Sequence, residues 1–327
     1  MADRVLITGA AGFIGSHLTE AVVQAGSSVR ALVHYNARNH WGWLEALAPD
    51  VLANIEVVAG DITDAFFVRH AVAGCDAVYH LAAQIAIPYS YVAPGSYVAC
   101  NVVGTLNVLQ ACRDEGVRRL VQTSTSETYG SAQYVPIDED HPLVAQSPYA
   151  ATKIGADKLV ESYVRTYGLP AAIIRPFNTF GPRQSARAII PTIISQALSG
   201  ASEIRIGSTT PVRDLTFVTD TAAGFMAVMA SDACVGQVTN IGRGEGITIG
   251  DLAALILRLC ESDARIVSEE ARVRPPDSEV TALVCNASRA AARCGWRPSV
   301  SLEEGLLQTI AWFRSNLRDY KAGLYNV

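Results

Sequence analysis

The chain has 327 residues, half of them hydrophobic, which suits one large domain with an added lobe or two domains that share a cleft. The net charge of −5 argues against nucleic acid as the main partner, because nucleic-acid binding normally needs a basic surface. Seven cysteines without a CxxC pair or a metal-like spacing indicate reduced thiols in a cytoplasmic protein and predict no metal site. We expect neither a signal peptide nor a membrane span, since a strand begins at Arg4 and no apolar run approaches roughly 20 residues.

A strand, a glycine-rich loop and a helix open the chain. Residues 4–8 form a short apolar, β-branched run typical of a buried strand, and apolar residues then recur at helical spacing until Gly26. The loop between them has the spacing GxxGxxG, which also occurs in purely structural turns, but the flanking strand and helix favour a dinucleotide site. Such glycines let the backbone approach a pyrophosphate at the helix N-terminus. The candidate cofactor contacts are Gly9, Gly12, Phe13, Ile14 and Gly15.

The end of the second predicted strand, residues 29–33, bears on the type of cofactor. An Asp or Glu there would bond the adenosine ribose, but the sequence has His34 and no acid. His34 and Arg38 would tolerate the 2′-phosphate of NADP, whereas Tyr35 or Asn36 would bond the ribose hydroxyls of NAD. These residues alone leave NAD and NADP open, with His34 and Arg38 as candidate contacts.

Two further strands, residues 55–59 and 77–81, end in candidate cofactor contacts. An Asp just past the first of them is placed to accept a hydrogen bond from an adenine amino group, or to cap the helix expected from Asp64 to Val72. Small residues after the second would let a cofactor lie close to the strand end. The candidates are Asp61, Ile62, Leu81, Ala82 and Ala83. His80, within an apolar run, is predicted to be a hydrogen-bonded core residue.

The stretch from Gln122 to Lys153 carries the residues of a proton-handling site. A strand at residues 119–123 delivers the candidates Thr125, Ser126 and Glu127. Tyr149 and Lys153 are four positions apart and therefore share one face of a helix. A lysine ammonium beside a phenol favours the phenolate, so the tyrosine would act as a base well below its usual pKa of about 10.

Strands at residues 171–175 and 237–241, with the alternating helices, predict a Rossmann-type α/β fold with a doubly wound parallel sheet. Ligands then bind at the carboxyl ends of the strands, where Pro176 and Asn178 add to the candidates. We assign residues 1–177, with about 214–242, to the dinucleotide-binding domain. Residues 178–213 and 243–327 are assigned to a smaller substrate-binding lobe, and a helix at 302–313 is expected to pack on it.

Arginines accumulate after Asn178, although the chain is acidic overall. They are Arg183, Arg187, Arg205, Arg213, Arg243, Arg272 and Arg274. The planar guanidinium suits phosphate oxygens, so they indicate an anion pocket, while solvent-facing arginines explain at least half of them. Arg213 and Arg274 are the strongest candidates because Asp214 and Asp277 stand near enough in the sequence to orient each guanidinium.

Together these motifs resemble an extended short-chain dehydrogenase/reductase of the NAD-dependent epimerase/dehydratase family, in the family's order over nearly the whole chain. The motifs are the glycine loop, Gly60-Asp61, His80-Leu81-Ala82-Ala83, Tyr149 with Lys153, Arg175-Pro176-Phe177-Asn178 and Arg274-Pro275-Pro276-Asp277. The resemblance implies tightly held NAD, or NADP, and a C-terminal lobe that binds a nucleotide-diphosphate sugar. It also implies a homodimer through two helices of each subunit, and substrate contacts at Asn178, Arg187, Arg213 and Arg274.

Within the family, Thr125-Ser126-Glu127 resembles the corresponding residues of nucleotide-sugar 4,6-dehydratases. Three longer runs, residues 41–44, 85–91 and 181–187, are similar to the UDP-N-acetylglucosamine 4,6-dehydratases of legionaminic acid biosynthesis. UDP-glucuronate decarboxylases share the triplet, a 4-epimerase needs only Thr125, Tyr149 and Lys153, and a non-catalytic dinucleotide sensor needs none of them.

The resemblance implies a role for each residue of the site. Tyr149 takes the C4 hydroxyl proton, Thr125 hydrogen-bonds the C4 oxygen and Glu127 removes the C5 proton before water leaves C6. Ser126 stands where dTDP-glucose dehydratases have Asp, and a serine hydroxyl is too weak an acid to protonate a leaving hydroxyl directly. Either Glu127 acts as both base and acid, or Ser126 relays the proton.

Overall fold

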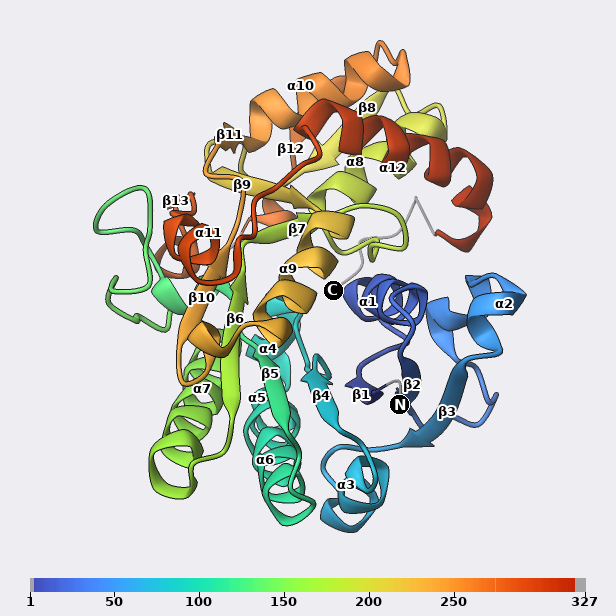
Figure 1. Cartoon of the computed structure of the whole chain (residues 1–327). Coiled ribbons are helices and arrows are strands. Elements are labelled where there is room, and N and C mark those ends of the chain that lie inside the picture. The colour runs from blue at the N-terminus through green and yellow to red at the C-terminus, as the bar shows by residue number, and fades with distance from the viewer. Residues whose placement is uncertain (1–2, 274, 321–327) are drawn as a thin grey trace.

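A seven-stranded parallel sheet forms the centre of the computed structural model, which describes residues 3–273 and 275–320 (Figure 1). The strand order is β10-β6-β5-β4-β1-β2-β3, and every neighbouring pair runs parallel. The strands are β1 (Arg4–Thr8), β2 (Ser28–His34), β3 (Ile55–Gly60), β4 (Ala77–His80), β5 (Arg119–Thr123), β6 (Ala171–Pro176) and β10 (Val238–Ile241). The predicted α/β fold with a parallel sheet is confirmed.

Helices cover both faces of this sheet, as buried apolar strands require. One face carries α1 (Phe13–Gln24) and α9 (Val218–Ala230), with α2 (Pro49–Leu52) and α11 (Ser288–Cys294) nearby. The other face carries α3 (Ala65–Val72), α6 (Gly104–Asp114) and α7 (Pro148–Tyr167). The short helices α4 (Ile87–Val92) and α5 (Pro94–Tyr97) lead into α6. Each fully buried Leu, Val or Phe in these cores contributes roughly 1.5–3 kcal/mol.

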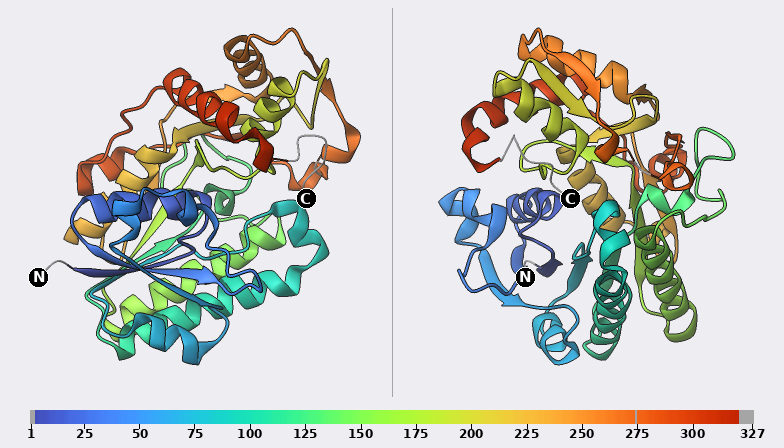
Figure 2. Two further views of the ribbon diagram at one scale, coloured as in Figure 1. Left: turned by 90° about the vertical axis from the view of Figure 1, so that its right-hand side faces the viewer. Right: turned by 180° about the vertical axis from the view of Figure 1, so that it is seen from behind.

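A smaller lobe stands on the side of the sheet where β6 ends (Figure 2). Its strands are β7 (Asn178–Phe180), β8 (Glu203–Ile206), β9 (Val212–Phe217), β11 (Gly246–Thr248), β12 (Arg265–Ser268) and β13 (Ala282–Leu283). β9 pairs with β7, β11 and β13, while β8 and β12 form a separate parallel pair. The helices α8 (Ile189–Leu198), α10 (Ile249–Cys260) and α12 (Leu302–Asn316) contribute to its core. The assignment of residues 1–177 and about 214–242 to the dinucleotide-binding domain, and of the rest of the chain to the substrate-binding lobe, stays a prediction.

The helical segment before α6 departs from regular α-helix geometry. Residues Val98–Val103 form a π-helical segment, η2, which α6 continues. Asn101 lies buried within this wider turn, and its side chain leaves the helix to bond other segments. Among residues 3–273 and 275–320, no helix is both long and apolar enough to cross a membrane.

Candidate active site

The glycine loop is packed so closely that two of its positions exclude any side chain. Gly9 has a φ of +72°, and a Cβ there would lie 2.8 Å from the Ala82 nitrogen. A Cβ at Gly15 would lie 2.1 Å from the Gly9 carbonyl oxygen. Gly12 precedes α1 and makes no side-chain cap, and the first turn of α1 has no acid. The loop therefore presents backbone N–H groups at a helix N-terminus, which fits the pyrophosphate of a dinucleotide.

Thr8 holds the end of β4 against this loop. Its hydroxyl oxygen accepts hydrogen bonds from the Leu81 and Ala82 N–H groups, each at 3.1 Å, and lies 2.7 Å from His80 Nδ1. The other ring nitrogen of His80 lies 3.2 Å from Thr105 Oγ1. Burial, with the nearby Lys153 charge, lowers the pKa of His80 to about 3. His80 is a neutral core residue, as predicted, and it fixes the strand end beside Ala82.

The predicted adenosine contacts lie at the ends of β2 and β3. His34 Nε2 is 3.6 Å from Asp61 Oδ2, and both side chains are exposed. Asp61 Oδ1 accepts hydrogen bonds from the Thr63 N–H and hydroxyl, which lower the pKa of the carboxyl group. Asp64 caps α3 through the N–H groups of residues 66 and 67, so Asp61 is not needed as the cap. Contacts of His34, Arg38, Asp61 and Ile62 with a cofactor stay predictions.

The catalytic candidates after β5 lie on one tight turn, η3 (Ser126–Tyr129). Thr125 caps this turn: its side chain accepts from the Glu127 N–H at 3.3 Å, and its carbonyl accepts from the Thr128 hydroxyl at 2.7 Å. Ser126 is buried, whereas Glu127 is half-buried. The turn directs these residues toward the start of α7.

Tyr149 and Lys153 lie one turn apart on α7 and are both buried, 7% and 3% exposed. α7 begins with Ser147, whose hydroxyl accepts from the Ala150 N–H at 3.1 Å, and with a proline at its first position. Lys153 Nζ donates to the Thr123 carbonyl oxygen at 2.6 Å. This bond joins α7 to the end of β5.

The pKa of the Tyr149 phenol shows which groups face it. Burial raises this pKa, a hydrogen bond with the Thr125 side chain lowers it, and the Glu127 carboxylate raises it. The Thr125 hydroxyl therefore lies within hydrogen-bond reach of the phenol, and the Glu127 carboxylate lies near enough for its charge to act on it. Burial also lowers the pKa of Lys153, and the Asp157 carboxylate opposes this effect. The expected lowering of the Tyr149 pKa by Lys153 is not found: burial raises the pKa, and the Lys153 ammonium donates to the Thr123 carbonyl instead.

Two supporting residues were missed at the sequence level. The Tyr97 ring meets the Tyr149 ring edge-on, with centroids 6.3 Å apart. Asn101 exchanges hydrogen bonds with the Gln84 backbone at 2.8 and 3.0 Å and donates to Thr152 Oγ1 at 3.0 Å. It thus joins the loop after β4 to α7. A lone Asn within an otherwise apolar helical segment was the available signal.

The proposed orientation of Arg213 by Asp214 is wrong. The Arg213 guanidinium donates to Glu279 Oε1 at 3.2 Å and to a backbone carbonyl at 3.0 Å. Asp214 instead accepts three backbone N–H groups, from Arg243, Gly244 and Cys285. A carboxylate next in sequence to a strand residue points to the opposite face, which explains the error.

The other residues predicted to bind the substrate differ in their burial and in their partners. Asn178 Oδ1 is buried and has no hydrogen-bond partner within the described part of the chain. Arg187 is exposed, yet its charge acts on Tyr97 and so lies near the Tyr149 end of the site. Arg183 pairs with Glu20 at 3.0 Å. Arg274 lies outside the described residues.

The structure places Thr125 and Glu127 on the turn after β5, and Tyr149 and Lys153 on α7, which packs against that turn. Across the ranges 3–273 and 275–320, no group of three or more His, Cys, Asp or Glu side chains is placed to hold a metal. The sheet, the loop and this constellation define a short-chain dehydrogenase/reductase with a Rossmann-type fold.

Comparison with known proteins narrows this class. The family model described as GDP-mannose 4,6 dehydratase matches residues 6–309. The chain is 34% identical over 317 residues to the dTDP-glucose 4,6-dehydratase of Streptomyces antibioticus, covering 96% of this chain and 93% of that protein. The chain belongs to the nucleotide-sugar dehydratases of the extended short-chain dehydrogenase/reductases.

Solved structures agree with this placement. The dTDP-glucose 4,6-dehydratase DesIV from Streptomyces venezuelae, determined with NAD bound, has a TM-score of 0.84 at 30% identity and covers 97% of this chain and 99% of its own. The UDP-glucose 4-epimerase of Thermotoga maritima, determined with UDP-glucose, has a TM-score of 0.87 at 29% identity and covers 96% and 99%. Dehydratases and epimerases share the fold, so the residues of the site must distinguish the reactions.

Proposed function

We propose that this nucleotide-sugar dehydratase acts on UDP-N-acetylglucosamine and forms a 4-keto-6-deoxy sugar. The observation that supports this proposal is the position of Glu127 on the turn η3, near enough to Tyr149 for its charge to raise the pKa of the phenol. A 4-epimerase has no step that needs a carboxylate there, whereas elimination of water needs a base at C5 and an acid at C6. The choice of UDP-N-acetylglucosamine rests on the sequence resemblance of residues 41–44, 85–91 and 181–187.

NAD is the cofactor, in agreement with the NAD-bound neighbour. Gly9, Gly12 and Gly15 would hold its pyrophosphate against α1. The Asp61 carboxylate, 3.6 Å from His34, supports NAD over NADP, because it would repel a 2′-phosphate at this position. When bound, NAD supplies the acceptor for the C4 hydride and returns that hydride at C6.

The residues of the chain would then move two protons. Tyr149 takes the C4 hydroxyl proton, and the Thr125 hydroxyl hydrogen-bonds the C4 oxygen. The resulting 4-keto group acidifies C5–H, and Glu127 removes that proton. The C6–O bond then breaks, and the hydroxyl leaves as water with the proton that Glu127 gained. When hydride returns to C6, the proton held by Tyr149 passes to C5, which restores the free enzyme. This assignment gives Glu127 both acid and base roles, with Ser126 as its neighbour on the same turn.

The lobe would bind the rest of the substrate. We propose that Asn178, Arg187 and Arg213 contact the nucleotide-diphosphate sugar, with Arg274 as a further contact predicted from the sequence. The Arg213 guanidinium is 7% exposed and already paired with Glu279, so its orientation is fixed before a ligand arrives. We also propose a cytoplasmic homodimer built on the face of η2 and α6.

Glu127→Gln tests the function directly. It removes the base and acid while keeping the size of the side chain, so kcat for water loss should fall about 10²–10⁴-fold. NAD binding should stay unchanged. The measurement is product mass after incubation with UDP-N-acetylglucosamine and, separately, with UDP-glucuronate.

The masses separate the alternatives. Loss of water from UDP-N-acetylglucosamine supports the proposal, loss of CO2 from UDP-glucuronate indicates a decarboxylase, and an unchanged mass with a new sugar configuration indicates an epimerase. A Glu127→Gln enzyme that eliminates water at the wild-type rate would remove the assignment. Tyr149→Phe is the matched control, since it should stop all three reactions.

A further inference from the structure

A buried ion pair lies directly behind the catalytic turn. Asp157 Oδ2 accepts hydrogen bonds from Arg175 Nη2 at 2.7 Å and from the Ser124 hydroxyl at 2.6 Å. The Arg175 Nε also reaches Ser124 Oγ, at 3.3 Å. The two charged side chains are only 2% and 0% exposed, so water does not reach them.

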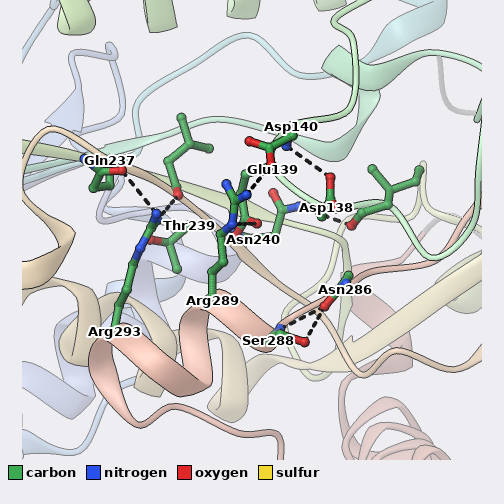
Figure 3. Close-up of polar contacts among 12 residues, drawn as sticks. Asp138, Glu139, Asp140, Gln237, Thr239, Asn240, Asn286, Ser288, Arg289 and Arg293 are labelled. Carbon is green, nitrogen blue, oxygen red and sulfur yellow. Dashed lines mark hydrogen bonds and ion pairs between the residues drawn. The ribbon is translucent and has the colours of Figure 1, made fainter.

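Tyr129 packs against the arginine of this ion pair. The Arg175 guanidinium carbon lies 4.7 Å from the centre of the Tyr129 ring, a cation–π contact. The Tyr129 hydroxyl donates to Asn240 Oδ1 at 2.7 Å, and the Asn240 N–H donates to Glu139 Oε1 at 2.8 Å. Figure 3 shows Glu139 beside Asn240 of β10 and Arg289 of α11. The buried pair is thus tied to the last strand of the main sheet.

Each contact of the pair adjoins a catalytic segment. Ser124 immediately precedes Thr125. Tyr129 ends η3, the turn that carries Ser126 and Glu127. Asp157 lies four residues after Lys153, on the same face of α7. The pair therefore fixes β5, η3 and α7 to one another at the point where they present their functional groups.

Stability alone does not account for such a pair. Taking two charges out of water is costly, and well-packed apolar residues in their place often leave a protein equally stable. We propose that Asp157, Arg175 and Tyr129 are positioning residues that hold the Thr125–Glu127 turn against Tyr149 and Lys153. This role rests on the proposed function of that turn. The effect of Asp157 on the pKa of Lys153, opposite to that of burial, is consistent with it.

The test removes both charges at once, so that neither is left buried alone. The full-length double variant Asp157→Asn/Arg175→Met should fold and bind NAD as the wild type does. Its kcat on UDP-N-acetylglucosamine should fall about 10- to 100-fold, the cost of a displacement near 1 Å, while KM changes less than about threefold. The matched control is Arg30→Met/Glu56→Gln, an ion pair on β2 and β3, which should leave kcat unchanged.

Crystal structures of wild type and double variant supply a readout that needs no substrate. We expect the Thr125–Glu127 turn to move by about 1 Å and the Lys153 Nζ to leave the Thr123 carbonyl. If the wild type converts no nucleotide sugar, the proposed function fails, and the structures still decide the positioning role.

An unmoved turn, or turnover equal to that of the wild type, overturns the proposal. Should the double variant not fold, Arg175→Lys replaces it: this change keeps the charge but loses the planar fork and the ring contact. It should show the same displacement and a smaller loss of kcat, and a wild-type position and rate would again overturn the proposal.

Discussion

At the scale of single residues, the pKa of the buried Tyr149 phenol is subject to opposing effects. Burial and the Glu127 charge hold its pKa above the usual value, and the Thr125 hydrogen bond lowers it. A base must lose its proton to act, so kcat/KM should rise with pH until the phenol of the free enzyme titrates. We therefore expect Thr125 to influence the pH at which the reaction starts, in addition to its proposed contact with the sugar.

Thr125→Val tests this relation. The valine keeps the shape but not the hydrogen bond, so the phenol pKa should rise and the rising limb of the kcat/KM profile should move to higher pH. Thr125→Ser, which retains the hydroxyl, is the control and should leave the limb in place. A limb at the same pH in both variants would exclude Thr125 as the group that tunes Tyr149.

The residues proposed to carry the chemistry could be identified from the sequence because their signals are local. Tyr149 and Lys153 show a helical spacing, and Thr125 to Glu127 follow an apolar strand. The ion pair of Asp157 and Arg175 was not predicted. The two residues lie on a helix and a strand, and the hydrophobic periodicity of neither element shows that the two are in contact. Arg213 was paired with the wrong acid for the same reason: its partner Glu279 is 66 residues away.

At the scale of elements, the strands of the main sheet and the starts of α3 and α12 were predicted from the sequence. Continuous apolar runs placed all seven strands of the main sheet within about two residues at their ends. The helix before α6 begins with Pro94 and passes through a π-helical segment, so its start is set by backbone geometry and by Asn101 contacts rather than by an apolar stripe. The lobe strands, with two to six residues each, gave little sequence signal.

The two aspartates after β3 have different roles: Asp64 caps α3, and Asp61 is predicted to contact the cofactor. Asp64→Ala removes the cap of α3 and should cost about 1 kcal/mol of unfolding free energy with NAD affinity unchanged. Asp61→Ala should weaken NAD binding with little effect on stability, because Asp61 makes no bond to α3. Denaturant melts and NAD titrations of both variants check this. The same loss of stability in each, with equal NAD affinity, would contradict the predicted role of Asp61.

At the scale of the whole molecule, aromatic contacts fasten the lobe to the first half of the chain. Trp43 lies 5.4 Å from Trp312 of α12 and stacks on Tyr320, with ring centroids 6.4 Å apart. The tyrosine hydroxyl also donates to the Gln184 carbonyl at 2.8 Å. The partners of Trp43 are thus the C-terminal helix and a residue shortly after it.

The proposed dimer interface lies on η2 and α6, which leave apolar side chains exposed. Val98, Val103 and Leu106 leave 50%, 41% and 38% of their surface exposed on η2 and α6. Leu106→Glu should convert a dimer to a monomer, because a charge would be buried at the interface. Leu307→Glu, at a 49% exposed leucine of α12, is the control and should stay dimeric. Light scattering measures both, and a wild-type monomer would rule out the interface.

The main sheet and the lobe are joined between β6 and β7 by Phe177 alone, a residue 2% exposed that also donates its N–H to the Ile241 carbonyl at 2.8 Å. A swing of the lobe at this junction would have to pull Phe177 out of its packing and break that bond. We therefore expect the lobe to keep its angle to the main sheet when a nucleotide sugar enters and leaves.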